Sequence, residues 1–205
     1  MKKLTLLAAL LITTSSLFAQ TIEITPLFGY TFSGKVNGYY GTYDVKDDML
    51  YGGILDVEVD HLLHAVISYR RNDPQLVEKS ILGGTDIYDI GVEHYQAGVI
   101  RELKDDKVKP FAGVSLGATR YFGKGRNNER YWLFSGAFEL GAKVFFNDVI
   151  GLRLQSNLTL PMEFGGGGIF CGIGTGGSGC SGSVYFNVPL VHWDLSAGLI
   201  IRLRN

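Results

Sequence analysis

Apolar and polar residues alternate with a period of two along several segments of this chain. The alternation is clearest over 149–160, where Leu152 and Leu154 flank Arg153, and it returns over 193–203. Successive side chains of a β-strand point to opposite faces, so this period predicts strands with one apolar and one polar face. The same pattern predicts six further strands, at 22–32, 50–60, 63–71, 88–102, 109–121 and 131–146.

The phase of the alternation changes within 88–102. Ile90 and Val92 fall on one face, whereas the apolar residues from Tyr95 onward fall on the other. An extra residue in one strand of an antiparallel pair shifts the following side chains to the opposite face. The sequence therefore predicts a β-bulge near 93–94.

The connections between the predicted strands alternate between short and long. Three short connections lie at 60–62, 104–107 and 147–148. Four long connections lie at 33–49, 72–87, 122–130 and 161–183. Short turns on one side and long loops on the other are typical of transmembrane barrels with an even number of strands. The sequence therefore predicts an all-β fold, an eight-stranded antiparallel up-and-down transmembrane β-barrel with short periplasmic turns and long extracellular loops.

The polar faces distinguish a membrane barrel from a soluble one. A soluble ligand-binding barrel carries its polar residues outside, whereas an outer-membrane barrel carries them in its lumen. The apolar faces here are nearly free of charge, with Arg120 as the exception, and a charge facing lipid at mid-depth costs about 2–4 kcal/mol. The polar faces combine small residues with charges, as a narrow lumen requires. Their charged residues are Glu23, Asp56, Glu58, Arg70, Glu139, Lys143, Arg153, Asp194 and Arg202.

Aromatic residues gather where the predicted strands meet the long loops, the position of an aromatic girdle at a membrane surface. These residues are Tyr30, Phe32, Tyr69, Tyr121, Phe122, Tyr131 and Trp132. The chain has 11 tyrosines and 12 phenylalanines but only 5 prolines, which suits many strands. Its formal net charge of −1 gives no basic surface for nucleic acid.

The first residues have the pattern of a cleaved export signal. Lys2 and Lys3 precede the apolar stretch 4–12, and Ala19 offers a small residue at a cleavage site. The apolar stretch is too short to cross a membrane as a helix. We therefore expect residues 1–19 to be a signal peptide and residues 20–205 to be one barrel domain.

The polar faces predict a network of charges inside the barrel. Glu139 and Lys143 share a face of one strand, and Arg153, Asp194 and Arg202 lie on the two strands that follow. Charges in a low-dielectric interior must pair. Eight strands leave room for side chains but not for an open aqueous channel, so we expect these ion pairs to fill the lumen. A gated ion path is the alternative.

Some outer-membrane barrels of this size modify lipids, so a nucleophile beside a histidine and an acid would indicate an enzyme. His192, Asp194 and Ser196 share one face of the last strand. Alternate residues of a strand are about 7 Å apart, too far for direct hydrogen bonds without a rotamer coincidence. We therefore expect no catalytic residues and no enzyme activity. No cofactor or metal is expected either, because two cysteines alone are too few ligands for zinc.

The last long loop is rich in glycine, with the sequence GGGGIFCGIGTGGSGCSGS over 165–183. Cys171 and Cys180 are the two cysteines of the chain, and in an exported protein they predict one disulfide. The loop also carries Ile169, Phe170 and Ile173, which we expect to form an exposed contact site for a surface partner. A protease-resistant loop without a partner is the alternative.

The chain resembles the small outer-membrane β-barrels of the OmpA-like and OmpX-like group. The resemblance rests on KPFAGVSLGAT at 109–119, SGAFELGAKVFF at 135–146, NDVIGLRL at 147–154 and the amphipathic last strand. It implies an outer-membrane barrel, and its motifs mark architecture rather than chemistry. The chain departs from the group by ending in Leu203-Arg204-Asn205 rather than in an aromatic residue, and we expect no peptidoglycan-binding domain after the predicted barrel.

Together these observations predict a non-enzymatic barrel of the cell outer membrane, with a role in envelope integrity or surface interaction. Its expected partners are outer-membrane lipid and an extracellular surface, and a monomer is favoured. The alternatives are a lipid-modifying barrel enzyme that uses His192 and Ser196, and a soluble ligand-binding barrel.

Overall fold

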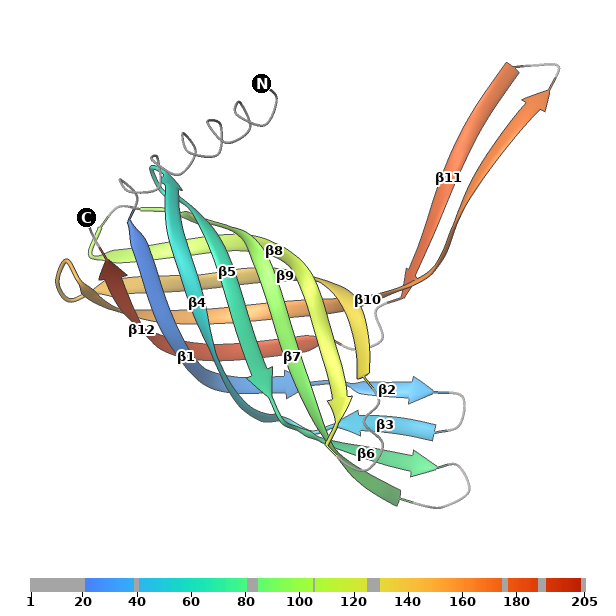
Figure 1. Ribbon diagram of the computed structural model, residues 1–205, viewed down its shortest axis with the longest axis horizontal. Coiled ribbons are helices and arrows are strands. Elements are labelled where there is room, and N and C mark those ends of the chain that lie inside the picture. The colour runs from blue at the N-terminus through green and yellow to red at the C-terminus, as the bar shows by residue number, and fades with distance from the viewer. Residues whose placement is uncertain are drawn as a thin grey trace, which may run out of the picture.

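Eight antiparallel strands close into a barrel in the computed structural model (Figure 1). Each strand pairs with two neighbours, and β1 closes the ring by pairing with both β12 and β4. The barrel strands are β1 (Ile22–Ser33), β4 (Asp48–Asp60), β5 (Leu63–Asn72), β7 (Thr85–Glu102), β8 (Val108–Gly123), β9 (Arg130–Phe145), β10 (Ile150–Gly174) and β12 (His192–Leu203). The structure describes residues 21–38, 41–80, 85–104, 106–124, 130–174, 177–187 and 191–203. The predicted fold class is confirmed, and the predicted signal peptide lies outside the described residues.

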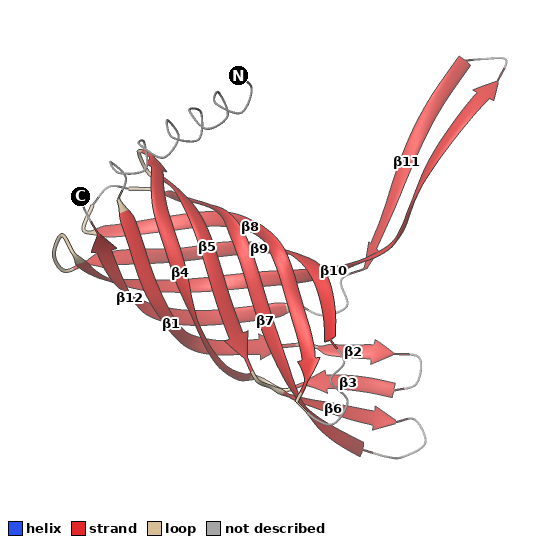
Figure 2. Ribbon diagram, viewed as in Figure 1, coloured by secondary structure: helices blue, strands red, loops and turns tan. Residues whose placement is uncertain are grey.

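Strands make up the regular structure throughout the described residues (Figure 2). Among these residues, no helix has the length and the apolar character to cross a membrane. The alternation that predicted β10 and β12 separates their faces as expected. In β10 the Arg153 side chain is fully buried, whereas its neighbour Leu154 is 47% exposed. In this part of β10, polar side chains thus point into the barrel and apolar side chains point outward.

The predicted β-bulge at 93–94 is wrong. The pairing of β7 with β5 and with β8 continues through these residues without a shift of register. Val92 points into the barrel and is fully buried, while Glu93 lies on the outer face. The change of phase therefore reflects two apolar residues with the inward phase, Ile90 and Val92, and one acidic side chain outside, not an inserted residue.

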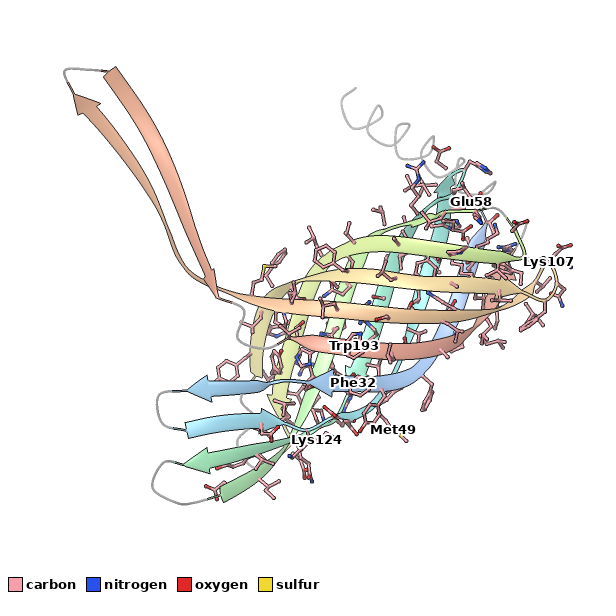
Figure 3. The ribbon with its side chains drawn as sticks, turned by 180° about the vertical axis from the view of Figure 1, so that it is seen from behind. Phe32, Met49, Glu58, Lys107, Lys124 and Trp193 are labelled. Carbon is pink, nitrogen blue, oxygen red and sulfur yellow. The ribbon has the colours of Figure 1, made fainter. Side chains whose placement is uncertain are left out.

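Short turns connect the strands at one end of the barrel, called here the short-turn end. In the turn after β4, Leu62 has a positive φ of 66°, and its carbonyl oxygen accepts a hydrogen bond of 2.8 Å from the Glu102 amide. In the turn between β9 and β10, Asn147 Oδ1 accepts hydrogen bonds from the amides of Val149 (2.9 Å) and Ile150 (2.7 Å). Such a local side-chain bond is a common way to form a turn. Glu58 and Lys107 lie at this end (Figure 3).

At the opposite end, called here the extension end, several strands continue beyond the barrel (Figure 1). A small sheet at this end contains β2 (Lys35–Gly38), β3 (Gly41–Val45) and β6 (Gln75–Ser80): β2 pairs with β3, β3 pairs with β6, and β6 pairs with the first residues of β7. The strand β11 (Gly177–Asn187) pairs with the last part of β10 as a long hairpin. Three of the four long connections therefore contain strands. The glycine run that favoured an open loop is part of a ladder, although glycine has a low β propensity.

The predicted girdle of aromatic residues lies at the extension end, but two of its members, Tyr121 and its register partner Tyr131, have the inward phase of their strands. Phe32 and Trp193 pack on the outer face with ring centroids 5.2 Å apart (Figure 3). Tyr121 instead points into the lumen, where its hydroxyl lies 2.8 Å from Nε2 of His192. The sequence does not assign an aromatic residue near a strand end to either face of the barrel wall, because the alternation of apolar and polar residues stops there.

Candidate functional site: the lumen of the barrel

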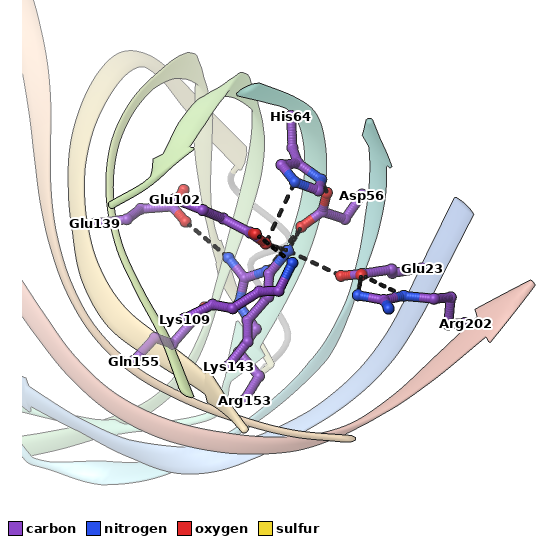
Figure 4. A network of polar contacts seen from close by, with 10 residues as sticks. All are labelled: Glu23, Asp56, His64, Glu102, Lys109, Glu139, Lys143, Arg153, Gln155 and Arg202. Atoms are coloured by element: carbon purple, nitrogen blue, oxygen red, sulfur yellow. Dashed lines mark hydrogen bonds and ion pairs between the residues drawn. The ribbon is translucent and has the colours of Figure 1, made fainter. Parts of the chain in front are cut away.

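Lys143 is the centre of a cluster of charges near the short-turn end of the lumen (Figure 4). Its Nζ lies 2.8 Å from Glu23 Oε2, 2.7 Å from Asp56 Oδ2 and 3.1 Å from Glu102 Oε1. The three carboxylates come from β1, β4 and β7, whereas Lys143 comes from β9. The Lys143 side chain is fully buried. One ammonium group therefore links four strands around the barrel.

Arg153 extends the cluster toward β10. Its Nη1 lies 3.1 Å from Asp56 Oδ2, its Nη2 lies 3.4 Å from Glu139 Oε2, and its Nε donates to Gln155 at 2.6 Å. The guanidinium carbon lies 4.4 Å from the centre of the Phe111 ring, a cation–π contact. Each edge and one face of the guanidinium group thus has a partner in the lumen.

Further ion pairs complete the cluster, which we call the Lys143 network. Arg202 contacts Glu23 at 2.8 Å, and Lys109 contacts Glu102 at 3.1 Å. His64 lies between Asp56 (2.8 Å) and Glu102 (3.3 Å), one carboxylate beside each ring nitrogen. A neutral imidazole has one N–H, so only the doubly protonated ring could donate to both. The network consists of Glu23, Asp56, His64, Glu102, Lys109, Glu139, Lys143, Arg153 and Arg202, with four carboxylates against four lysine or arginine side chains.

An apolar layer lies next to the Lys143 network on its extension side. Ile54, Val66, Ile100 and Phe111 are each buried and lie two residues along a strand from a member of the network. Leu27 completes this cluster from β1. The sequence pattern does not single out these residues, because single apolar side chains on polar faces look like breaks in the alternation. Their burial and their shared inward phase identify them as a layer across the lumen.

Arg70 and Asp194 form a second polar cluster beyond the apolar layer. Arg70 Nη1 lies 2.5 Å from Asp194 Oδ2, its Nη2 donates to Thr159 Oγ1 at 3.2 Å, and neither charged side chain is exposed. Asp194 was expected beside Arg153 and Arg202. It lies eight residues from Arg202 along β12, a separation of about 26 Å at the rise of a strand. That distance, together with Arg70 on the opposite side of the lumen, separates Asp194 from the Lys143 network.

The histidines near the extension end do not assemble a catalytic row. His192 Nδ1 lies 3.3 Å from Ser33 Oγ and its Nε2 lies 2.8 Å from the Tyr121 hydroxyl. Asp194 is engaged by Arg70, and the Ser196 hydroxyl has no hydrogen-bond partner among the described residues. Within the described ranges, no group of three or more His, Cys, Asp or Glu residues could hold a metal ion.

The predicted loop residues lie in the hairpin of β10 and β11. The backbone register pairs Cys171 directly with Cys180. Ile169, Phe170 and Ile173 belong to β10. The side chains of these five residues lie outside the described part of the structure. The disulfide and the contact site therefore stay predictions.

Solved structures similar to this chain include an outer membrane protein and a bacterial surface protein, which are described below. No protein-family model matches this sequence, and no curated protein is significantly similar to it.

Outer membrane protein OprG of Pseudomonas aeruginosa is 12% identical, with a TM-score of 0.65 over 91% of this chain and 97% of its own. Neisserial surface protein A is 12% identical, with a TM-score of 0.59 over 90% and 97%. The N-terminal barrel domain of Pseudomonas aeruginosa OprF is 11% identical, with a TM-score of 0.51 over 89% and 97%. The fold of this chain is thus that of small outer-membrane barrels, as the resemblance in sequence implied.

Proposed function

We propose that this protein is a non-enzymatic barrel of the bacterial outer membrane, closed to ions by its lumen, and that its extensions contact an extracellular surface. The orientation of the two faces carries the proposal. Phe28, Ile67 and Leu140 on the outer face are 60% to 67% exposed, whereas Asp56 and Arg153 in the lumen are fully buried. Such an outer face would be insoluble in water but is matched to lipid. This orientation argues against a soluble ligand-binding barrel.

Two layers support a closed lumen. The Lys143 network fills the barrel near the short-turn end with paired charges, and the apolar layer of Leu27, Ile54, Val66, Ile100 and Phe111 follows it. An ion crossing the lumen would have to separate buried ion pairs and then pass a constriction that disfavours water. Both steps are costly, which favours an ion-pair plug over a gated path.

The arrangement around His192 supports a non-enzymatic role. A lipid-modifying enzyme would need a nucleophile within hydrogen-bond reach of its base. The base candidate His192 is engaged by Ser33 and Tyr121, and Asp194 is engaged by Arg70. We infer that these residues stabilise the barrel. Unchanged lipid profiles in cells with His192→Ala would agree with this role, and an altered profile would argue for the enzyme.

The extensions supply the contact surface in this proposal. The sheet of β2, β3, β6 and β7 and the hairpin of β10 and β11 leave the barrel at the same end (Figure 1). The hairpin carries Ile169, Phe170 and Ile173 in its outer part. Apolar residues on an exposed extension are typical of interaction sites.

Three measurements test the proposal. Heat modifiability in an outer-membrane fraction should give a band that shifts on boiling, and recovery of soluble protein without detergent would contradict the membrane location. Planar bilayers containing the purified protein should show no stepwise currents, and regular steps would contradict the closed lumen. Deleting 164–182 should leave the shift intact and abolish adhesion of producing cells to polystyrene beads. A matched variant that keeps the hairpin but replaces Ile169, Phe170 and Ile173 by serine should lose the same adhesion.

A further inference from the structure

Charged side chains form a row on the outer face of the barrel at its extension end. The backbone register makes Arg71 the partner of Glu93, and Glu93 the partner of Arg120. The row ends in an aromatic residue on each side: Tyr51 of β4 is the partner of Arg71, and Trp132 of β9 is the partner of Arg120. All five residues have the outward phase of their strands. This is the face that carries apolar residues elsewhere, so two arginines here need an explanation.

Glu93 pairs with both arginines, but it is then saturated and cannot accept from their remaining N–H groups. It accepts hydrogen bonds from the hydroxyls of Tyr69 (3.3 Å) and Tyr95 (3.0 Å), and it contacts Arg71 (3.4 Å) and Arg120 (3.0 Å). Four donors fill the acceptor sites of one carboxylate. Arg71 also contacts Asp73 at 3.1 Å. Among the described residues, the Nε of Arg120 is buried and has no hydrogen-bond partner, whereas 21% of the Arg120 side chain as a whole is exposed.

Aromatic rings hold the two guanidinium groups at this level. Arg71 and Arg120 both lie over the Phe122 ring, at 5.2 and 4.9 Å from its centre. Arg120 also lies 5.6 Å from the centre of the Trp132 ring. Stacking uses the face of a guanidinium group and leaves its N–H edges available for an acceptor in its plane. Aromatic residues of this kind mark the level of the lipid headgroups.

We propose that Arg120, supported by Arg71, binds the phosphate of a lipid headgroup in the extracellular leaflet. Arginine binds phosphate oxygens with charge-assisted hydrogen bonds. Arg120 contacts Glu93 through Nη1, and its side chain is 21% exposed, so its outer edge can meet such an acceptor. A phosphate-bearing lipid brings an acceptor to this level, while its acyl chains cover the apolar face below. This site lies on the outer wall of the barrel, so it is distinct from the surface interaction proposed for the extensions.

Native mass spectrometry of the detergent-purified full chain tests the site. The probe is lipid A carrying two phosphates, compared with the same lipid after removal of its phosphates and with inorganic phosphate alone. We expect retention of the phosphorylated lipid by the wild type, and retention about tenfold weaker in Arg120→Gln, because a charge-assisted bond is lost. The dephosphorylated lipid should be retained weakly by both proteins. Inorganic phosphate at the same concentration should not displace the lipid.

Arg101→Gln is the matched control. Arg101 also lies exposed on the outer face of β7, but near the short-turn end and away from the aromatic rings, so its replacement should leave retention unchanged. Each variant is first checked for a heat-modifiable band, and Arg71→Gln is scored by the same criterion if Arg120→Gln does not fold. Equal retention by the wild type and the folded variant would overturn the proposal. So would an equal loss in Arg101→Gln, or full displacement by inorganic phosphate.

Discussion

Lys143 Nζ and Asp56 Oδ2 lie 2.7 Å apart in the lumen, and neither side chain is exposed. The two residues belong to β9 and β4, which are not neighbours in the sheet. Their contact therefore crosses the interior of the barrel. A buried charge that loses its partner carries its full desolvation cost, which makes this pair sensitive to the removal of either member.

Replacing Lys143 by methionine should destabilise the barrel by about 3–5 kcal/mol, because Glu23, Asp56 and Glu102 would then face one another with less positive charge. The measurement is the urea concentration at the midpoint of unfolding in detergent, and unfolding is monitored by the loss of the heat-modifiable band. Lys107→Met, in an exposed turn, is the matched control and should unfold close to wild type. A Lys143→Met midpoint within error of the control would show that the network contributes little.

Gly117→Ala should destabilise the barrel by about 1–3 kcal/mol, because it forces a side chain into a closely packed wall. A Cβ at this position would lie 1.8 Å from the carbonyl oxygen of Tyr95, a backbone atom of the neighbouring strand that cannot rotate away. Gly53→Ala is the control, since the nearest atom to its Cβ lies at 3.9 Å. Equal urea midpoints for the two variants would contradict the close approach of β7 and β8.

The ion pairs of Asp73 at the extension end predict that the stability of the barrel depends on pH. It lies between β5 and β6 and contacts Lys124 at 3.0 Å and Arg71 at 3.1 Å. Burial raises the pKa of the Asp73 carboxyl, but hydrogen bonds from Lys124 and Arg71 outweigh it and lower the pKa below the ordinary value of 3.8. A carboxyl with a lowered pKa stabilises the folded state above that ordinary value, and the contribution is lost as the pH falls toward the folded pKa.

The measurement is the difference in urea midpoint between the wild type and Asp73→Asn. This difference should be constant from pH 7 down to about pH 5 and should shrink below about pH 4. Asp106→Asn, in an exposed turn, controls for the loss of one negative charge. A difference that stays constant down to pH 3 would show that the ion pairs of Asp73 do not contribute to stability.

The backbone register of the hairpin predicts the state of the two cysteines. Directly paired residues of antiparallel strands have Cα atoms about 4.5–5.5 Å apart, within the range that a disulfide bridges. The unfolded protein should therefore take up no maleimide before reduction and two maleimides after it, as measured by intact mass. Two labels without reduction would show that Cys171 and Cys180 are free thiols.

Much of the barrel could be predicted from the sequence because a period of two assigns each side chain to a face. Arg153 and Leu154 are separated in this way, and the eight barrel strands follow from such pairs. The assignment fails where a single residue breaks the pattern for a local reason. Val92 lies inside the lumen, and Glu93 lies outside because Arg71, Arg120 and two tyrosines satisfy it there.

The grouping of the charges could not be predicted in the same way. Which lumen residues meet depends on the stagger between strands far apart in the sequence, and a single chain does not reveal that stagger. Glu139, Lys143, Arg153 and Arg202 lie in one network, but Asp194 lies with Arg70. Glu102 and Lys109, at strand ends, were not expected to take part.

The Lys143 network also bears on the order in which such a barrel can be assembled. Lys143 and Glu23 are 120 residues apart, and their strands lie on either side of β12 and β10 in the sheet. No single hairpin holds a complete set of partners, so a half-curled sheet would present unneutralised carboxylates and amines. Water must solvate these groups until β1 meets β12, and it must leave as the seam closes. We therefore expect the interior to lose its water late in assembly, and variants that weaken the seam should accumulate as hydrated, protease-sensitive intermediates.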